Sequence, residues 1–161
     1  MRISKNRVFS VYIFDEILKK VKNITEKYEF EVFGYLIGEL FQWNSKLYII
    51  INDMIYIESC TDSTRYSVSQ IKGSAGEYEK EFRRLKKKNN NKNLRVLGWW
   101  HSHPNLGCFL SSTDLSTQKF FFPESYQVAL VIDPMKKNYK FFTLDENNNK
   151  GYKEVSHAII R

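Results

Sequence analysis

The sequence predicts a mixed α/β fold, in which a sheet of about six strands is flanked by two or three helices. Runs rich in β-branched and aromatic residues recur along the chain, and amphipathic segments with helical spacing separate them. Of the 161 residues, 42% are hydrophobic and 16% are aromatic, which suffices for a packed core. We detect no internal repeat and no dividing linker, so residues 1–161 are interpreted as one domain.

The N-terminal half is predicted to contain three strands and one helix. Asp15 is the expected N-cap of a helix over residues 15–28, because apolar side chains recur there at helical spacing. Gly34 and Gly38 are expected to permit close approach of neighbouring backbone. The predicted strands cover residues 8–14, 31–41 and 47–57, with a turn around Asn44 and Ser45 before the third. The predicted apolar helix face consists of Ile17, Leu18, Val21, Ile24 and Tyr28.

The C-terminal half continues the alternation of helices and strands. Residues 61–73 are polar and indicate a loop, and a helix is predicted over residues 74–88. A shorter helix is predicted to start near Ser112 or Thr113 and to end at Phe122, where Pro123 follows. The side chains expected to face inward from the longer helix are Tyr78, Phe82 and Leu85. Further strands are predicted at residues 95–101, 126–132 and 139–144, before a short C-terminal segment.

Charge and cysteine content exclude several classes of protein. The formal net charge of +7 favours acidic partners, but the run Lys86–Lys88 beside an Asn-rich stretch is typical of a solvated helix end. Because no RNA-binding aromatic signature accompanies the run, no specific nucleic acid is expected as a partner. Cys60 and Cys108 are too few for a disulfide scaffold and no secretory signal is evident, so we expect a cytoplasmic protein. No apolar run approaches the roughly 18 residues of a membrane span, so no membrane partner is expected.

Two of the three histidines, His101 and His103, lie two residues apart at the end of an apolar run. In a strand, residues i and i+2 project to the same face, so both imidazoles can bind one metal ion. A catalytic zinc takes three protein ligands and leaves the fourth position for water. Asp114 is the best candidate for the third ligand, since it follows a loop that can turn the chain back. A single histidine in a strand is more often a core residue, but Pro104 and Ser111 at their spacings favour a metal site.

The stretch HSHPNLGCFLSSTD, residues 101–114, resembles the JAMM motif of the JAB/MPN metalloprotease family. That motif reads H-[ST]-H-P, with a serine eight residues and an aspartate eleven residues after the second histidine. Counting from His103 gives Ser111 and Asp114, so the adjacent Ser112 is not the motif serine. The motif mixes residue types at fixed intervals, which makes a chance match improbable.

The resemblance extends over most of the chain, from about Glu31 to Pro134. EVFGYLIGEL, residues 31–40, is similar to the family segment that carries an upstream glutamate, and Glu31 takes that position. Glu29 and Glu39 do not fit the register. VALVIDP, residues 128–134, is also similar to family members such as the deneddylase subunit of the COP9 signalosome and the proteasome lid deubiquitinase. The shortness of the chain is more like the stand-alone prokaryotic members.

The resemblance implies the fold, the cofactor and the chemistry of the family. The implied fold is the MPN/JAB fold, which is cytidine-deaminase-like, and the implied cofactor is Zn²⁺ held by His101, His103 and Asp114. Glu31 would take a proton from the zinc-bound water and pass it to the leaving amine. Ser111 would donate a hydrogen bond to the developing oxyanion, in addition to or instead of capping a helix.

The implied substrates are amide or isopeptide bonds after the C-terminal tail of ubiquitin or a ubiquitin-like protein. Such a tail would add as a strand beside the sheet, and its Gly-Gly end would let the backbone approach the metal. Residues 105–110 are expected to help form the groove, and residues 61–73 are the nearest candidate for a substrate-gripping insertion. Ubiquitin or ubiquitin-like conjugates are therefore the expected partners. Proteins of a bacterial ubiquitin-like conjugation or antiphage system are further expected partners.

Two alternative functions keep the same fold. In the first alternative, the chain is a non-catalytic MPN interaction module. In the second, it is a JAMM hydrolase whose substrates are small peptides or sulfur-carrier precursors. Cys108, inside the motif loop, suggests a nucleophile or a further ligand, but packing is the better interpretation. Trp99 and Trp100 are expected to build the core and the pocket wall. His157 is interpreted as a surface or packing residue.

Overall fold

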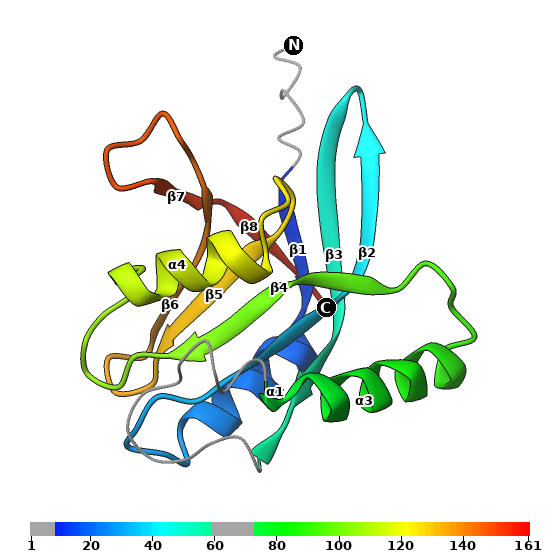
Figure 1. Ribbon diagram of the computed structural model, residues 1–161, viewed down its shortest axis with the longest axis horizontal. Coiled ribbons are helices and arrows are strands. Elements are labelled where there is room, and N and C mark those ends of the chain that lie inside the picture. The colour runs from blue at the N-terminus through cyan, green and yellow to red at the C-terminus, as the bar shows by residue number, and fades with distance from the viewer. Residues whose placement is uncertain (1–8, 59–72) are drawn as a thin grey trace.

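The computed structural model describes residues 9–58 and 73–161 and shows one mixed sheet with helices against both faces (Figure 1). The strand order is β7-β6-β5-β4-β2-β3-β1-β8. The strands are β1 (Val11–Phe14), β2 (Phe33–Trp43), β3 (Lys46–Tyr56), β4 (Arg95–Ser102), β5 (Val128–Asp133), β6 (Asn138–Leu144), β7 (Tyr152–Val155) and β8 (His157–Ile160). The helices in the described part of the chain are α1 (Asp15–Thr25), α3 (Ala75–Lys88) and α4 (Ser112–Phe121). The predicted mixed α/β class is confirmed, with eight strands instead of about six.

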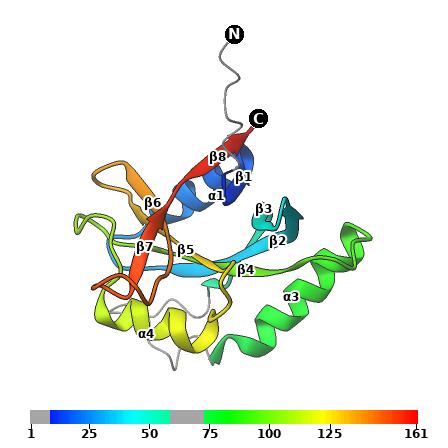
Figure 2. The same ribbon diagram turned by 90° about the horizontal axis from the view of Figure 1, so that it is seen from above.

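The two additional strands, β7 and β8, come from the segment predicted only as a short C-terminal piece. They stand at opposite ends of the strand order although only Ser156 separates them in the chain. β7 pairs antiparallel with β6, and β8 pairs parallel with β1. The sheet therefore curls until one continuous C-terminal segment bridges its two ends, as Figure 2 shows for the red strands.

The two faces of the sheet carry two separate apolar clusters, with α1 on one face and α3 and α4 on the other (Figure 2). Neighbouring residues alternate between the clusters, as expected for strands. Trp100 belongs to the cluster around α1, whereas Trp99 belongs to the opposite cluster, and both are fully buried. The prediction that both tryptophans build the core is confirmed.

Helix α1 differs from its prediction at both ends. Its N-cap is Phe14, which provides no side-chain cap, so the expected capping role of Asp15 is wrong. Asp15 lies instead in the first turn, where its carboxylate is 2.6 Å from Lys19 Nζ and suits the positive end of the helix dipole. The helix ends at Thr25 rather than Tyr28. Its buried apolar residues, Ile17, Leu18 and Val21, belong to the predicted face.

Close packing of β2 on its neighbours depends on its glycines, as predicted. A Cβ atom at Gly34 would lie 2.3 Å from the carbonyl oxygen of Ile55, and one at Gly38 would lie 1.9 Å from that of Ile50. The β2–β3 turn at Asn44 and Ser45 uses the left-handed region, with φ of 47° and 62°. This packing fixes the register that sets Phe33, at the start of β2, opposite His101.

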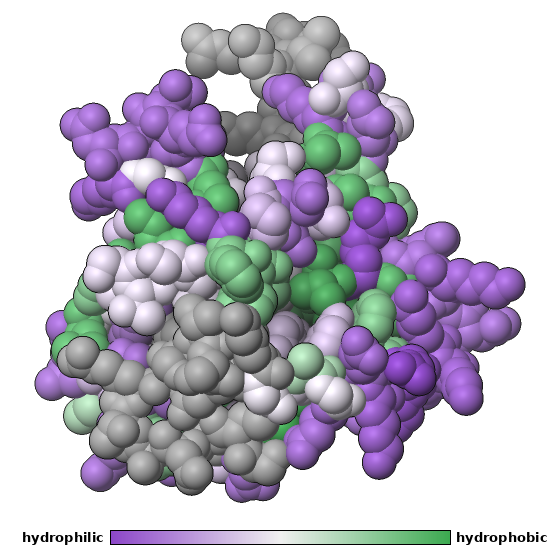
Figure 3. All heavy atoms as spheres, in the orientation of Figure 1, coloured by the Kyte–Doolittle hydropathy of each residue, from purple (hydrophilic) through white to green (hydrophobic). Residues whose placement is uncertain are grey.

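The remaining helices follow their predictions closely. In α3, Leu85 is buried and Tyr78 and Phe82 are half-buried, while the outer surface is hydrophilic (Figure 3). Helix α4 begins at Ser112, one of the two predicted starts. The predicted loop 61–73 lies almost wholly outside the described residues, and Cys60 does too. None of the helices that the structure describes has the length and apolarity needed to cross a membrane.

Candidate metal centre

The end of β4 presents two imidazoles to one side of the sheet. His101 is fully buried, and its ring stacks on Trp99 with centroids 4.2 Å apart and planes at 19°. His103 is 2% exposed, and its ring centroid lies 4.8 Å from that of His101. The backbone N–H of His103 donates to the Ile132 carbonyl at 2.8 Å, which continues the parallel pairing of β4 with β5. The strand pairing therefore fixes the backbone from which both rings project.

The first turn of α4 supplies the carboxylate. Ser111 is the N-cap: its hydroxyl accepts from the Asp114 N–H at 3.1 Å, and its own N–H donates to Asp114 Oδ2 at 2.7 Å. This reciprocal pair is a capping box, which fixes the aspartate rotamer as well as the helix start. The capping interpretation of Ser111 is thus observed.

The three predicted ligands converge. Asp114 Oδ1 lies 3.4 Å from His101 Nε2, and Asp114 Oδ2 lies 3.2 Å from His103 Nε2. One ligand atom from each residue lies within 4.8 Å of the other two, and all three residues are buried. Two imidazoles and one carboxylate are a ligand set that zinc takes in catalytic sites, so the donor chemistry fits this ion.

Burial sets the protonation of the cluster. Desolvation, with the neighbouring His103, holds the pKa of His101 well below its usual value. Desolvation also lowers the pKa of His103, although the hydrogen bond to the Gly107 carbonyl and the charge of Asp133 oppose this. Both rings are therefore neutral at pH 7, which is the form that binds metal. Burial raises the pKa of Asp114 to about 7, the Ser111 N–H opposes the rise and Glu31 adds to it.

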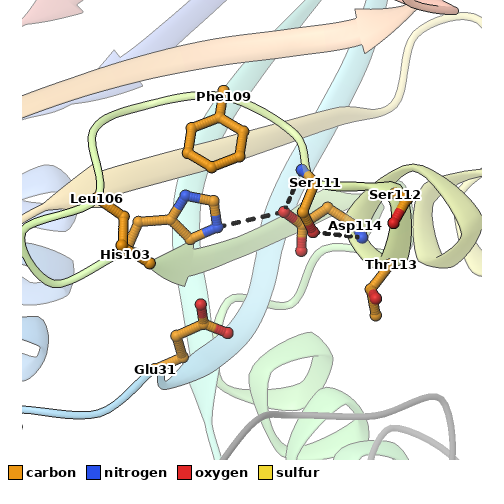
Figure 4. Close-up of a pocket in the computed structure, with 8 residues that line it drawn as sticks. All are labelled: Glu31, His103, Leu106, Phe109, Ser111, Ser112, Thr113 and Asp114. Atoms are coloured by element: carbon orange, nitrogen blue, oxygen red, sulfur yellow. Dashed lines mark hydrogen bonds and ion pairs between the residues drawn. The ribbon is translucent and has the colours of Figure 1, made fainter.

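A pocket of about 230 Å³ opens beside the cluster, and Figure 4 shows its lining. Glu31 projects into it from the segment before β2, facing His103 and Asp114. Neither Glu29 nor Glu39 lines it, in agreement with the register argument. The lining residues are Glu31, His103, Leu106, Phe109, Ser111, Ser112, Thr113 and Asp114. All five predicted site residues thus lie at the pocket or directly behind it, with His101 behind.

Other residues singled out in the sequence have packing roles. Cys108 is half-buried against the cluster beside α3 and α4, and burial raises the pKa of its thiol, which disfavours a thiolate nucleophile. It does not belong to the metal-binding group. His157 is half-buried, with its ring against Tyr139 and Phe141. The packing interpretations of Cys108 and His157 are confirmed.

Three residues that support the site were not singled out from the sequence. Ser102 lies between the two histidines, and its hydroxyl accepts a hydrogen bond from the Val32 N–H. Gln118 on α4 accepts a hydrogen bond from Trp99 Nε1. Asp133 accepts a hydrogen bond from the Gly107 N–H in the loop after His103. A polar residue inside a buried strand end, and an aspartate that ends an apolar strand, are the signals that would have drawn attention to Ser102 and Asp133.

This curled α/β sheet, with a buried His-His-Asp cluster at the end of β4, defines a candidate metal-binding enzyme fold. The model of the JAB family, JAB1/Mov34/MPN/PAD-1 ubiquitin protease, matches residues 7–124. The chain therefore belongs to the JAB family.

Individual relatives agree with this membership. The chain is 31% identical to a 26S proteasome regulatory subunit RPN11 from Encephalitozoon cuniculi over 122 residues, which are 74% of this chain and 38% of that protein. It is 55% identical to the ubiquitin carboxyl-terminal hydrolase RPN11 of Saccharomyces cerevisiae over 42 residues, which are 26% of this chain and 14% of that protein. It is 34% identical to COP9 signalosome complex subunit 5 of Candida albicans over 109 residues, which are 66% of this chain and 17% of that protein.

The matched segments therefore span well under half of each of these relatives. A solved structure, protein DSY2949 from Desulfitobacterium hafniense, superposes with a TM-score of 0.66 over 94% of this chain and 93% of that one. At 16% identity this likeness shows the fold alone.

Proposed function

We propose that this protein is a zinc-dependent isopeptidase or peptidase that cleaves after the C-terminal tail of ubiquitin or a ubiquitin-like protein. The observation that carries the proposal is the buried cluster of His101, His103 and Asp114 beside a pocket lined by Glu31 and Ser111. Membership of the JAB family, and a relative named as a ubiquitin carboxyl-terminal hydrolase, support the choice of reaction and substrate.

The roles of the residues follow from their positions. A zinc ion, when bound, supplies Lewis acidity that makes water a usable nucleophile near neutral pH and polarises a carbonyl. Glu31, in the pocket beside the cluster, takes the proton of the attacking water and returns it to the leaving amine. The Ser111 hydroxyl uses one lone pair to accept from the Asp114 N–H. Its own proton therefore remains for the developing oxyanion, where such a donor contributes about 10²–10³ in rate.

The size of the pocket favours a narrow chain at the cleavage point. Its volume of about 230 Å³ is below the roughly 300–1,000 Å³ of pockets that enclose drug-sized ligands. A Gly-Gly terminus fits because it carries no side chains. Leu106 and Phe109, which are 57% and 40% exposed at the pocket, offer apolar contacts to the residues before the glycines.

The test compares Glu31→Gln with the control Glu29→Gln, an exposed glutamate outside the pocket. We expect Glu31→Gln to retain one zinc per chain and to cleave a ubiquitin or ubiquitin-like fusion at least about 10²-fold more slowly. Glu29→Gln should cleave at the parental rate. Parental cleavage by Glu31→Gln would show that the role assigned to Glu31 is wrong.

The same assay decides between the alternatives. A parental protein that holds no stoichiometric zinc and cleaves nothing, but binds a ubiquitin-like protein, would be a non-catalytic MPN module. Cleavage of short peptides in preference to the fusion would favour the small-substrate hydrolase. A role for this protein in a bacterial ubiquitin-like conjugation or antiphage system stays a prediction. Genes for activating and conjugating enzymes next to the gene of this protein would support it.

A further inference from the structure

Asp133 is a buried carboxylate at the end of β5 to which the proposed reaction gives no role. It is fully buried and accepts four backbone hydrogen bonds. Two come from the β5–β6 turn, from the N–H groups of Met135 and Lys136 at 3.1 and 3.0 Å. The other two cross to the loop after His103, from the N–H groups of Asn105 and Gly107 at 3.0 and 2.8 Å. One side chain therefore joins two separate turns.

The carboxylate is charged in the folded protein. Burial by itself would raise the pKa of Asp133, but the four donated hydrogen bonds outweigh it and lower the pKa below the usual value. Charge-assisted hydrogen bonds of this kind are roughly twice as strong as neutral ones. Replacing Asp133 by a neutral side chain would therefore weaken all four bonds together.

The loop that Asp133 holds has an unusual backbone. Asn105 and Gly107 both lie in the left-handed region, with φ of 61° and 84°. For Asn105 this conformation is tolerated but not preferred. The turn directs both N–H groups at the same anion, as backbone nests do. Without the carboxylate these two N–H groups would lose their partner, and the loop would have less reason to keep this conformation.

The same loop touches a predicted metal ligand. The carbonyl oxygen of Gly107 lies 3.1 Å from His103 Nδ1. A carbonyl can only accept, so Nδ1 must carry the proton when the ring is neutral, and the lone pair then belongs to Nε2. Nε2 is the atom that faces Asp114, at 3.2 Å. Gly107 thus donates its N–H to the Asp133 carboxylate, and its carbonyl sets the tautomer of His103.

We propose that Asp133 is a positioning residue of the metal centre, which holds Gly107 so that His103 presents Nε2 as the ligand atom. Asp133 touches neither the metal position nor the pocket, and it acts only through the loop. The inference rests on the proposed metal centre, but its effect on the ring of His103 does not require an ion.

The first measurement is zinc affinity, by competition with a chromophoric chelator at pH 7.5, of Asp133→Asn. Partners that orient a metal-ligating histidine typically contribute 10–100-fold in affinity, so we expect a loss of at least about tenfold. The matched control is Asp145→Asn, because Asp145 also caps a turn after a strand: its carboxylate accepts from the Asn147 N–H at 3.0 Å, within the β6–β7 loop rather than in the loop after His103. The control should bind zinc within about twofold of the parent.

The second measurement is the ¹⁵N spectrum of the histidine side chains in chelator-treated protein. The parent should show His103 as one tautomer protonated at Nδ1, and Asp133→Asn should show a mixture. A parent without zinc affinity but with this tautomer change would overturn the proposed function and leave the positioning role intact. A folded Asp133→Asn with parental zinc affinity and parental tautomer would overturn the positioning role.

Gly107→Ala tests the same positioning role if Asp133→Asn does not fold. A Cβ atom at Gly107 would meet nothing within 4 Å, but φ of 84° disfavours alanine. The substitution therefore disturbs the loop alone and leaves Asp133 and the β5–β6 turn in place. We expect weaker zinc binding and a mixed tautomer of His103. Parental values of both would contradict the proposal.

Discussion

The hydroxyl of Ser102 accepts a hydrogen bond from the backbone N–H of Val32 at 3.0 Å, although the two residues belong to distant parts of the chain. The N–H of Ser102 donates in return to the Val32 carbonyl at 2.9 Å. Ser102 is the residue between the two histidines, and Val32 directly follows Glu31. The end of the strand that presents the two predicted histidine ligands thus also fixes the segment that carries the predicted general base.

Ser102→Ala should lower both stability and turnover. The buried N–H of Val32 loses its acceptor, which costs about 1–3 kcal/mol of unfolding free energy. Because Glu31 is then held less firmly, we expect kcat to fall while zinc content is retained. Denaturant unfolding and steady-state kinetics measure the two effects. Ser116→Ala is the control, since the exposed Ser116 hydroxyl donates only within α4, to Ser112 at 3.0 Å, and should change little.

Gln118→Leu should destabilise the contact between α4 and β4. The buried Gln118 accepts from Trp99 Nε1 at 2.6 Å and donates to the Phe122 carbonyl at 3.1 Å. Leucine removes the acceptor of the buried Trp99 Nε1–H and the donor to the Phe122 carbonyl, so we expect a loss of about 2–4 kcal/mol in chemical denaturation. Because His101 stacks on Trp99, zinc affinity should weaken as well. Gln42→Leu, at an exposed position, is the matched control, and an equal loss there would contradict this explanation.

The parts of the fold that were predicted correctly carry local signals. The alternation of side chains around Trp99 and Trp100 marks a strand buried on both faces, and the spacing from His103 to Asp114 places a carboxylate after one loop. A capping box at Ser111 then needs only neighbouring residues. These features were therefore visible in the sequence before any tertiary contact was known.

The parts that were missed depend on contacts between distant segments. β8 pairs with β1, from the other end of the chain, and its four residues are too few to show a strand pattern on their own. Asp133 was not singled out from the sequence, because its partners Asn105 and Gly107 come from another loop. Asp15 looked like a cap, but the helix begins so close to β1 that Phe14 takes that position.

Lowering the pH should destabilise the folded protein through His157, the first residue of β8. Burial and then Lys22 lower the pKa of His157 while Glu154 opposes them, and its Nε2 lies 3.0 Å from the Tyr139 hydroxyl. A histidine whose folded pKa is depressed contributes stability above about pH 6.5, and this is lost as the pH falls toward the folded pKa. The melting temperature of the parent should therefore drop by a few degrees more between pH 7.5 and pH 5 than that of His157→Gln. Parallel pH profiles of the two proteins would show that His157 has no such role.

Asp114→Asn should abolish zinc binding and yet stabilise the protein in the presence of a chelator at pH 8. The pKa of Asp114 is raised to about 7, mainly by burial, so this carboxyl contributes stability below its unfolded pKa and loses it as the pH rises through 7. At pH 8 the parent holds a buried charge that asparagine lacks, whereas the asparagine oxygen can still accept from the Ser111 N–H. At pH 6 the parental carboxyl is mostly protonated, and His101 and His103 are still neutral because burial lowers their pKa values. We expect the variant to unfold less readily than the parent at both pH values, with a gain about 1 kcal/mol larger at pH 8 than at pH 6, because the unfolded carboxyl is already ionised at pH 6 whereas the folded one ionises near pH 7. A gain of the same size at both pH values would trace the stabilisation to packing, and a loss at pH 8 would mean that the carboxylate is stabilised by its neighbours even without a metal ion.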